Sequence, residues 1–187
     1  MNQKIKRPVY ASVNFSARQL RKQDIVTHLE QIVNDIGIDP KYLQLELTET
    51  AYLDKQVEVI DRISQLENLG FSIAIDDFGV GYASLVYLQK IPASTIKIDR
   101  SFITDMHTSE EHETFVKAIL TLGRNLNKEI IAEGVEKMQH LDILSMQKCY
   151  KYQGFLFSKP MKIEDLEAFI HYESKITGIN DDEKSDK

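Results

Sequence analysis

Short segments rich in β-branched and aliphatic residues alternate along the chain with longer segments whose apolar residues recur every three or four positions. This alternation is typical of repeated strand and helix units that build a parallel sheet. The short segments predict six strands, at residues 9–15, 42–48, 72–78, 94–99, 129–134 and 152–157. The periodic segments predict surface helices at residues 24–36, 54–69, 110–126, 137–147 and 163–172. The expected fold class is therefore α/β, with helices packed on a parallel sheet.

Length and composition fit one soluble domain. A chain of 187 residues with 42% hydrophobic and 28% charged residues has the balance of a globular protein. No apolar run approaches the roughly 20 residues that a membrane helix needs, and residues 1–8 are not followed by the apolar stretch of a secretion signal. We expect a cytoplasmic domain over residues 1–176. Residues 177–187 hold a single apolar side chain, Ile179, among polar and charged residues and are expected to form a disordered tail.

The charge balance narrows the choice of partners. A formal net charge of −6 argues against a protein that binds DNA or RNA polymers through a basic face. The positive charge that binds a phosphate ligand would have to be local. Carboxylates that bind metal cations can supply it, because they reverse the sign of the local potential.

Polar side chains follow the predicted strands at the ends where a parallel α/β sheet places its active site. These residues are Asn14, Glu46, Glu49, Asp76, Asp77, Lys97, Asp99, Glu133, Glu136 and Gln153. Taken singly, an Asn or Asp at a strand end is more often a turn former or a helix cap than a ligand. Polar chemistry at the end of every predicted strand instead indicates one shared site.

Asp76 and Asp77 give the strongest chemical signal, because they directly follow the apolar segment 72–75. Adjacent carboxylates at a buried strand end repel each other unless a cation lies between them. Oxygen ligands favour Mg²⁺ or Mn²⁺ over zinc. The single cysteine, Cys149, excludes a multi-cysteine metal site, and the five histidines fall on helices or loops, where we expect them to be solvated.

Six short motifs succeed one another along these strands. They are Val13-Asn14-Phe15-Ser16, Glu46-Leu47-Thr48-Glu49, Asp76-Asp77-Phe78-Gly79-Val80-Gly81-Tyr82, Lys97-Ile98-Asp99, Ala132-Glu133-Gly134-Val135-Glu136 and Gln153-Gly154-Phe155. In order and spacing they resemble the signatures of the EAL-domain family of cyclic di-GMP phosphodiesterases, from about Val9 to about Phe169. The resemblance implies a TIM-type (β/α) barrel that binds cyclic di-GMP with a two-metal site of Mg²⁺ or Mn²⁺.

The resemblance also implies roles for the motif residues. Asn14, Glu46 and Asp76 would ligate one metal, and Asp76 would bridge to a second metal that Asp77 also binds. The catalytic residues would be Lys97, which orients or activates the attacking water, and Glu133, a ligand or base near it. The residues that complete the pocket would be Asp99, Glu136 and Gln153.

A loop is implied to couple substrate binding to dimerisation. The residues concerned are Glu49, Phe78, Gly79, Gly81 and Tyr82. The partners implied are a second copy of the chain or an upstream sensory or GGDEF-type domain. Val80 and Ala83 stand where the family has Thr and Ser, and Tyr150 stands where it has Asp.

The predicted barrel is incomplete, since six strands are expected and a closed barrel of this type has about eight. The family's Glu-Ala-Leu motif, whose Glu ligates metal, should precede the Asn14 strand, and the sequence holds no such tripeptide. We therefore expect an N-terminally truncated barrel without its first strands.

Three hypotheses remain open at this point. The domain hydrolyses cyclic di-GMP to linear pGpG, or it is a catalytically inactive domain that binds the nucleotide or a protein partner, or the chain is a fragment of a longer protein. All six predicted strands keep the polar pocket residues at their ends, which favours an enzyme-type domain. Whether this chain alone is active stays open.

Overall fold

The structure, a computed structural model, describes residues 9–48, 56–81 and 85–176. Its six strands are parallel and lie side by side in sequence order. They are β1 (Ala11–Asn14), β2 (Leu43–Thr48), β3 (Ser72–Phe78), β4 (Thr95–Ile98), β5 (Glu129–Glu133) and β6 (Tyr152–Gln153). The α/β class is confirmed, with the strand order of an incomplete TIM-type barrel. The predicted tail, 177–187, lies outside the described residues.

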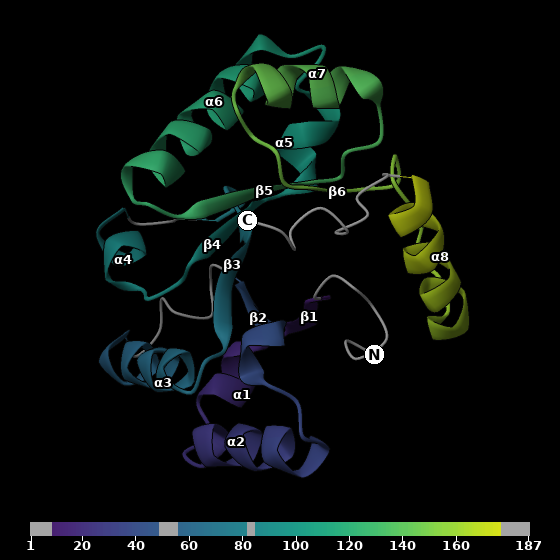
Figure 1. The fold of residues 1–187 in the computed structure, drawn as a ribbon. Helices are drawn as coiled ribbons and strands as arrows, with labels where there is room; N and C mark the ends of the chain where they lie inside the picture. The colour runs from purple at the N-terminus through teal and green to yellow at the C-terminus, as the bar shows by residue number, and fades with distance from the viewer. Residues whose placement is uncertain (1–8, 49–55, 82–84, 177–187) are drawn as a thin grey trace, which may run out of the picture.

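Helices cover one side of the curved sheet, and the last helix lies apart on the other side (Figure 1). The covering elements are α1 (Ala17–Leu20), α2 (Ile25–Ile36), η1 (Pro40–Tyr42), α3 (Gln56–Asn68), α4 (Leu85–Lys90), α5 (Arg100–Asp105), α6 (Glu110–Asn125) and α7 (Met138–Met146). The last helix is α8 (Ile163–Ile176). The side of the sheet away from α2–α7 is called the inner face, and it is the side on which α8 lies (Figure 1).

The core lies between the sheet and the covering helices. Side chains alternate between the two faces of a strand, and the residues directed at the helices are aliphatic. The fully or nearly fully buried ones are Leu45, Leu47, Ile73, Ile75, Ile96, Ile98 and Ala132. Their burial fixes which face of each strand is left for the site.

The inner face is polar even below the strand ends. Ser12 Oγ donates to Gln44 Oε1 at 3.2 Å, and Gln44 Nε2 donates to Thr95 Oγ1 at 3.1 Å. This chain of hydrogen bonds joins β1, β2 and β4, so the inner face is held by polar contacts instead of apolar packing.

The structure corrects the predicted sixth strand, because β6 ends at Gln153 and not at residue 157. Gly154 approaches the segment that follows β5 so closely that a Cβ there would lie 2.1 Å from Val135 O. The chain then turns, with Phe157 N donating to Gly154 O. The short helices α1, α4 and α5 were not predicted, since four to six residues are too few to show a helical period.

Within the described part of the chain, β1 pairs only with β2, and β6 pairs only with β5. Both outer strands are short, which limits the backbone that they leave unpaired. Among the same residues, no helix is both long and apolar enough to cross a membrane.

Candidate metal centre

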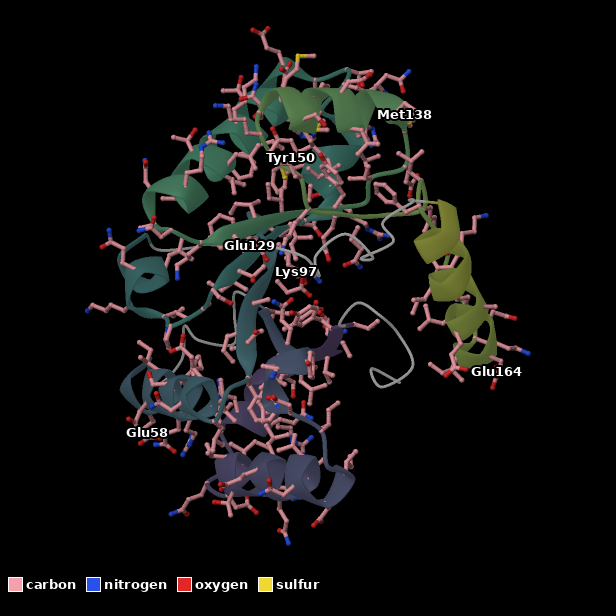
Figure 2. The ribbon with its side chains drawn as sticks, in the orientation of Figure 1. Glu58, Lys97, Glu129, Met138, Tyr150 and Glu164 are labelled. Atoms are coloured by element: carbon pink, nitrogen blue, oxygen red, sulfur yellow. The ribbon has the colours of Figure 1, made fainter. Side chains whose placement is uncertain are left out.

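Lys97 lies at the centre of the inner face, at the end of β4, on the side of the sheet that faces away from α6 (Figure 2). Its Nζ atom is 2.8 Å from Glu46 Oε1, 3.3 Å from Asp76 Oδ1 and 2.6 Å from Glu133 Oε1. The Lys97 side chain is only 3% exposed. Residues from β2, β3, β4 and β5 thus meet at a single ammonium group.

Lys97 stays charged in this setting. Burial by itself lowers the pKa of Lys97, but the hydrogen bonds to Glu133 and Glu46 outweigh it and raise the pKa above its ordinary value. Lys97 is therefore held as a cation that donates hydrogen bonds to Glu133 and Glu46.

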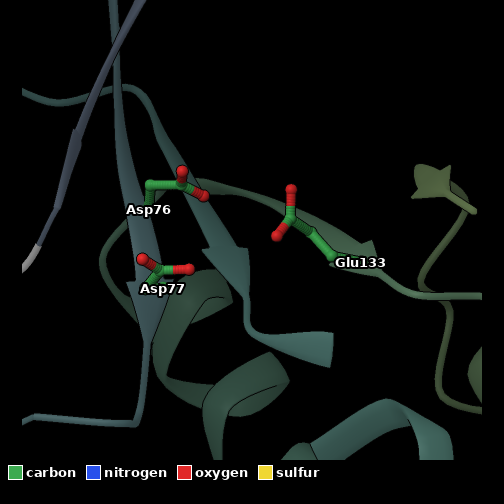
Figure 3. A group of neighbouring side chains, drawn as sticks. All are labelled: Asp76, Asp77 and Glu133. Atoms are coloured by element: carbon green, nitrogen blue, oxygen red, sulfur yellow. The ribbon is translucent and has the colours of Figure 1, made fainter. Parts of the chain in front are cut away.

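A β-bulge explains how two consecutive residues reach the same site. Neighbouring residues of a regular strand point to opposite faces, yet the carboxylates of Asp76 and Asp77 both point toward Glu133 (Figure 3). Asp77 has a left-handed backbone with φ of 53°, and the pairing between β3 and β4 shifts its register here. Bulges next to functional sites commonly redirect a side chain in this way. Asp is also one of the residues that tolerates a positive φ.

The carboxylates form a cation-binding arrangement. Oxygen atoms of Asp76, Asp77 and Glu133 all lie within 4.8 Å of one another. Asp76 Oδ1 is buried and accepts no hydrogen bond among the described residues, although Lys97 lies 3.3 Å away. A buried carboxylate oxygen that makes an ion-pair contact but no hydrogen bond, together with an all-oxygen set, fits a hard divalent cation.

Electrostatics point the same way. Burial raises the pKa of Asp77, and the neighbouring carboxylates of Asp76 and Asp99 add to the effect. Burial also raises the pKa of Glu133, against the contrary influence of Lys97. One lysine does not neutralise the cluster, so a bound cation would stabilise the ionised carboxylates.

Glu46 and Asn14 lie beside this cluster. Glu46 is 7% exposed and pairs in register with Asn14 across β1 and β2. Paired positions share a face of the sheet, so Asn14 lies on the inner face, where its side chain is exposed. The structure thus brings Asn14 next to Glu46, and its role as a ligand stays a prediction.

Glu133 also lines a cavity of about 530 Å³ between the ends of β5 and β6 and the helix α8. Predicted pocket residues Glu136 and Gln153 line the same cavity. Arg100, which the motifs did not single out, contributes a positive charge, and Phe169 contributes part of the apolar wall. Because Glu133 belongs both to the carboxylate cluster and to the cavity wall, the cluster borders a space large enough for a ligand of drug size.

Asp99 has a structural partner. Its Oδ1 accepts hydrogen bonds from the backbone N–H of Ser101 at 2.9 Å and from the Ser101 hydroxyl. Asp99 thereby caps the N-terminus of α5. Asp99 is still close enough to affect the pKa of Asp77. Its predicted pocket role stays a prediction.

The predicted coupling loop is only partly described. Glu49 and Tyr82 lie outside the described residues. Phe78, Gly79 and Gly81 line an apolar groove of about 410 Å³ against α6, away from the carboxylates. Gly79 has φ of 106°, and a Cβ there would lie 2.8 Å from the Phe102 ring, so the turn requires glycine.

The expectation that all histidines are solvated is wrong. His28 is exposed, but His140 is completely buried, and His107 and His112 each bury their Nδ1 atom. His140 lies four residues before the buried Leu144 on α7. That spacing on one helix face was the signal in the sequence that should have placed His140 in the interior.

The comparisons with known proteins decide the family. The sequence profile of the EAL domain matches residues 1–160. The chain belongs to the EAL domain family. The resemblance read from the six motifs is thereby confirmed.

Individual relatives of this EAL domain agree. It is 40% identical over 160 residues to the bifunctional diguanylate cyclase/cyclic di-GMP phosphodiesterase MucR of Pseudomonas aeruginosa, an alignment that covers 85% of this chain and 23% of MucR. Its fold is similar to the solved PaMucR phosphodiesterase in complex with c-di-GMP, with a TM-score of 0.80, 38% identity and coverage of 84% and 64% of the two chains.

A second solved structure was determined with a metal. The EAL domain is 28% identical to Klebsiella pneumoniae BlrP1 in a manganese/cy-diGMP complex, with a TM-score of 0.75, covering 81% of this chain and 39% of that one. The chain spans about a fifth of the length of the curated relatives that it matches.

Proposed function

We propose that this domain hydrolyses cyclic di-GMP to linear pGpG in a reaction that needs Mg²⁺ or Mn²⁺. The observation that carries the proposal is the carboxylate cluster of Asp76, Asp77 and Glu133, whose buried Asp76 Oδ1 accepts no hydrogen bond from the described residues. MucR and BlrP1, whose structures contain this nucleotide, support the choice of substrate.

The proposed ligands are those implied by the motifs. Asn14, Glu46 and Asp76 would hold one cation, and Asp76 and Asp77 a second one, with Glu133 close to both aspartates. Bound divalent cations would supply positive charge for the attacking and leaving oxygens of a displacement at phosphorus.

The chain's own residues have distinct tasks in this proposal. Lys97 remains protonated and donates to Glu133 and Glu46, so it fixes both carboxylates and adds positive charge beside the phosphate. Glu133 is the carboxylate available to accept a proton from water. Glu136, Gln153 and Arg100 line the adjoining cavity and would contact the nucleotide.

The test separates binding from hydrolysis. Calorimetry measures Mn²⁺ and cyclic di-GMP binding, and chromatography measures linear pGpG formation with each cation. We expect Asp76→Asn to lower Mn²⁺ affinity by at least about 100-fold, since losing even an outer partner of a metal ligand costs up to about 100-fold, and to abolish hydrolysis.

Asp35→Asn on the exposed surface of α2 is the matched control and should change neither property. Full Mn²⁺ affinity in Asp76→Asn would contradict the two-metal site.

A second function is favoured by departures inside the motifs, since Val80, Ala83 and Tyr150 stand where the family has Thr, Ser and Asp. Under this alternative the domain binds cyclic di-GMP, or a protein partner, without hydrolysing the nucleotide. Nucleotide binding without linear product in either Mg²⁺ or Mn²⁺ would favour the alternative, and turnover would exclude it.

Partners and location remain part of the proposal. A GGDEF-type domain is a reasonable neighbour because MucR is named as a bifunctional cyclase and phosphodiesterase. A homodimer and a cytoplasmic location, both predicted from the sequence, stay predictions.

A further inference from the structure

The cavity is lined by Glu133, the last residue of β5, and by Glu136 in the segment between β5 and α7. The middle of this segment is firmly anchored, because Val135 N donates to Gln153 O at 3.0 Å and Val135 O accepts from Leu156 N at 3.1 Å. Gly134 has φ of 72° and lies against Arg100, where a Cβ would approach within 2.5 Å of the Arg100 side chain. These contacts fix the backbone up to Val135, and the next backbone donor along the segment is the N–H of Glu136.

His140 provides that anchor from inside the protein. It lies in the first turn of α7, is 0% exposed, and its Nδ1 accepts a hydrogen bond from the backbone N–H of Glu136 at 3.3 Å. Lys137, the N-cap residue of α7, makes no side-chain capping bond. Because Nδ1 is the acceptor, the neutral ring must carry its proton on Nε2.

His107 and Lys137 lie close to the His140 ring. The rings of His107 and His140 are 5.0 Å apart, and Lys137 Nζ donates to His107 Nε2 at 3.1 Å. Burial lowers the pKa of His140, and the nearby His107 and Lys137 lower it further. The ring therefore stays neutral, which keeps Nδ1 available as an acceptor.

We propose that His140 is a positioning residue that holds the Glu136 backbone, and so directs the Glu136 side chain at the cavity. The inference rests on the proposed function only in taking cyclic di-GMP as the ligand of that cavity. Glu133 is held separately, through its 2.6 Å contact with Lys97, so losing the His140 acceptor should leave the metal cluster in place. A histidine that only filled the core would not affect nucleotide and metal binding differently.

The test compares two variants that differ in the acceptor. His140→Leu keeps apolar volume and removes the acceptor, whereas His140→Asn offers Oδ1 in place of Nδ1. In His140→Leu we expect the Glu136 amide to exchange with solvent roughly tenfold faster and cyclic di-GMP to bind roughly tenfold more weakly, with Mn²⁺ affinity within about twofold of wild type. His140→Asn should restore amide protection and nucleotide affinity. Unchanged exchange and nucleotide affinity in His140→Leu would overturn the proposal.

A measurement on the wild-type chain covers the case in which His140→Leu does not fold. Long-range ¹H–¹⁵N spectra report which ring nitrogen carries the proton. The Nε2–H tautomer supports the proposal, and the Nδ1–H tautomer overturns it, because a protonated Nδ1 cannot accept from Glu136. If the wild type binds no cyclic di-GMP, the proposed function fails, while amide exchange and tautomer still decide the role of His140.

Discussion

The two faces of strands β2, β3, β4 and β5 are stabilised in opposite ways. Their outer face presents Ile75, Ile96 and Ile98 to the helices, with no more than 1% of each residue exposed. Their inner face presents Lys97 among Glu46, Asp76 and Glu133. Burying an aliphatic side chain stabilises a fold by roughly 1.5–3 kcal/mol, whereas burying charges costs free energy that only good pairing offsets.

The difference separates stability from function along single strands. Ile75 and Asp76 are neighbours in sequence, yet one contributes to the apolar core and the other to the cation cluster. We therefore expect outer substitutions to change the free energy of unfolding and leave metal affinity intact. Substitutions on the inner face should change the free energy of unfolding and the metal affinity together.

The largest expected effect follows from removing the inner cation. Lys97→Met leaves buried carboxylates without their ammonium partner, and breaking such a buried pair typically costs about 3–5 kcal/mol of unfolding free energy. Added Mn²⁺ should restore part of this loss, because a bound cation again compensates the carboxylates. Urea unfolding with and without Mn²⁺ measures both effects.

Lys117→Met on α6 is the control, since Lys117 pairs with Glu113 at the surface and its loss should cost at most about 0.5 kcal/mol. Equal stability of Lys97→Met and wild type would show that the inner ion pairs do not hold the sheet together.

The next effect belongs to the outer face. Ile75→Ala removes a fully buried side chain, and we expect the unfolding free energy to fall by about 2–4 kcal/mol through lost burial and the cavity left behind. Mn²⁺ affinity of the folded protein should stay within about twofold of wild type. Ile36→Ala, at a position 70% exposed, should change stability by less than about 0.5 kcal/mol. A large loss of Mn²⁺ affinity in Ile75→Ala would break the separation of the two faces.

The sequence predicted this division of faces well in the middle of the sheet. Apolar alternation in β2 to β5 was strong enough to place the strands, and adjacent Asp76 and Asp77 were enough to predict a cation site. The bulge at Asp77 was not predictable, because a local change of register depends on how β3 meets β4 and leaves no periodic pattern.

Tertiary contacts also account for the other differences. The end of β6 is set by the close approach of Gly154 to Val135, two residues that lie far apart in the sequence. His140 was placed in solvent because it falls on a helix away from the strand ends, although its helical position relative to Leu144 is buried. Local sequence predicts which segments pair, and less well where close backbone contacts end them.

The smallest expected effect concerns pH, and it sharpens the comparison by adding a buried group that lies on neither face of the sheet. Burial, His107 and Lys137 lower the pKa of His140 below its ordinary 6.5, while a hydrogen bond to the Thr104 backbone and the charge of Glu136 act in the opposite direction. The unfolded chain then binds a proton at a higher pH than the folded chain does, so stability rises with pH in this range. The contribution is complete above the unfolded pKa and is lost as pH falls below it. We expect the melting temperature to fall between about pH 7.5 and pH 5.5, and to fall less in His140→Asn, whose side chain does not titrate. An equally steep fall in His140→Asn would assign the pH dependence to other groups, such as the inner-face carboxylates, and not to His140.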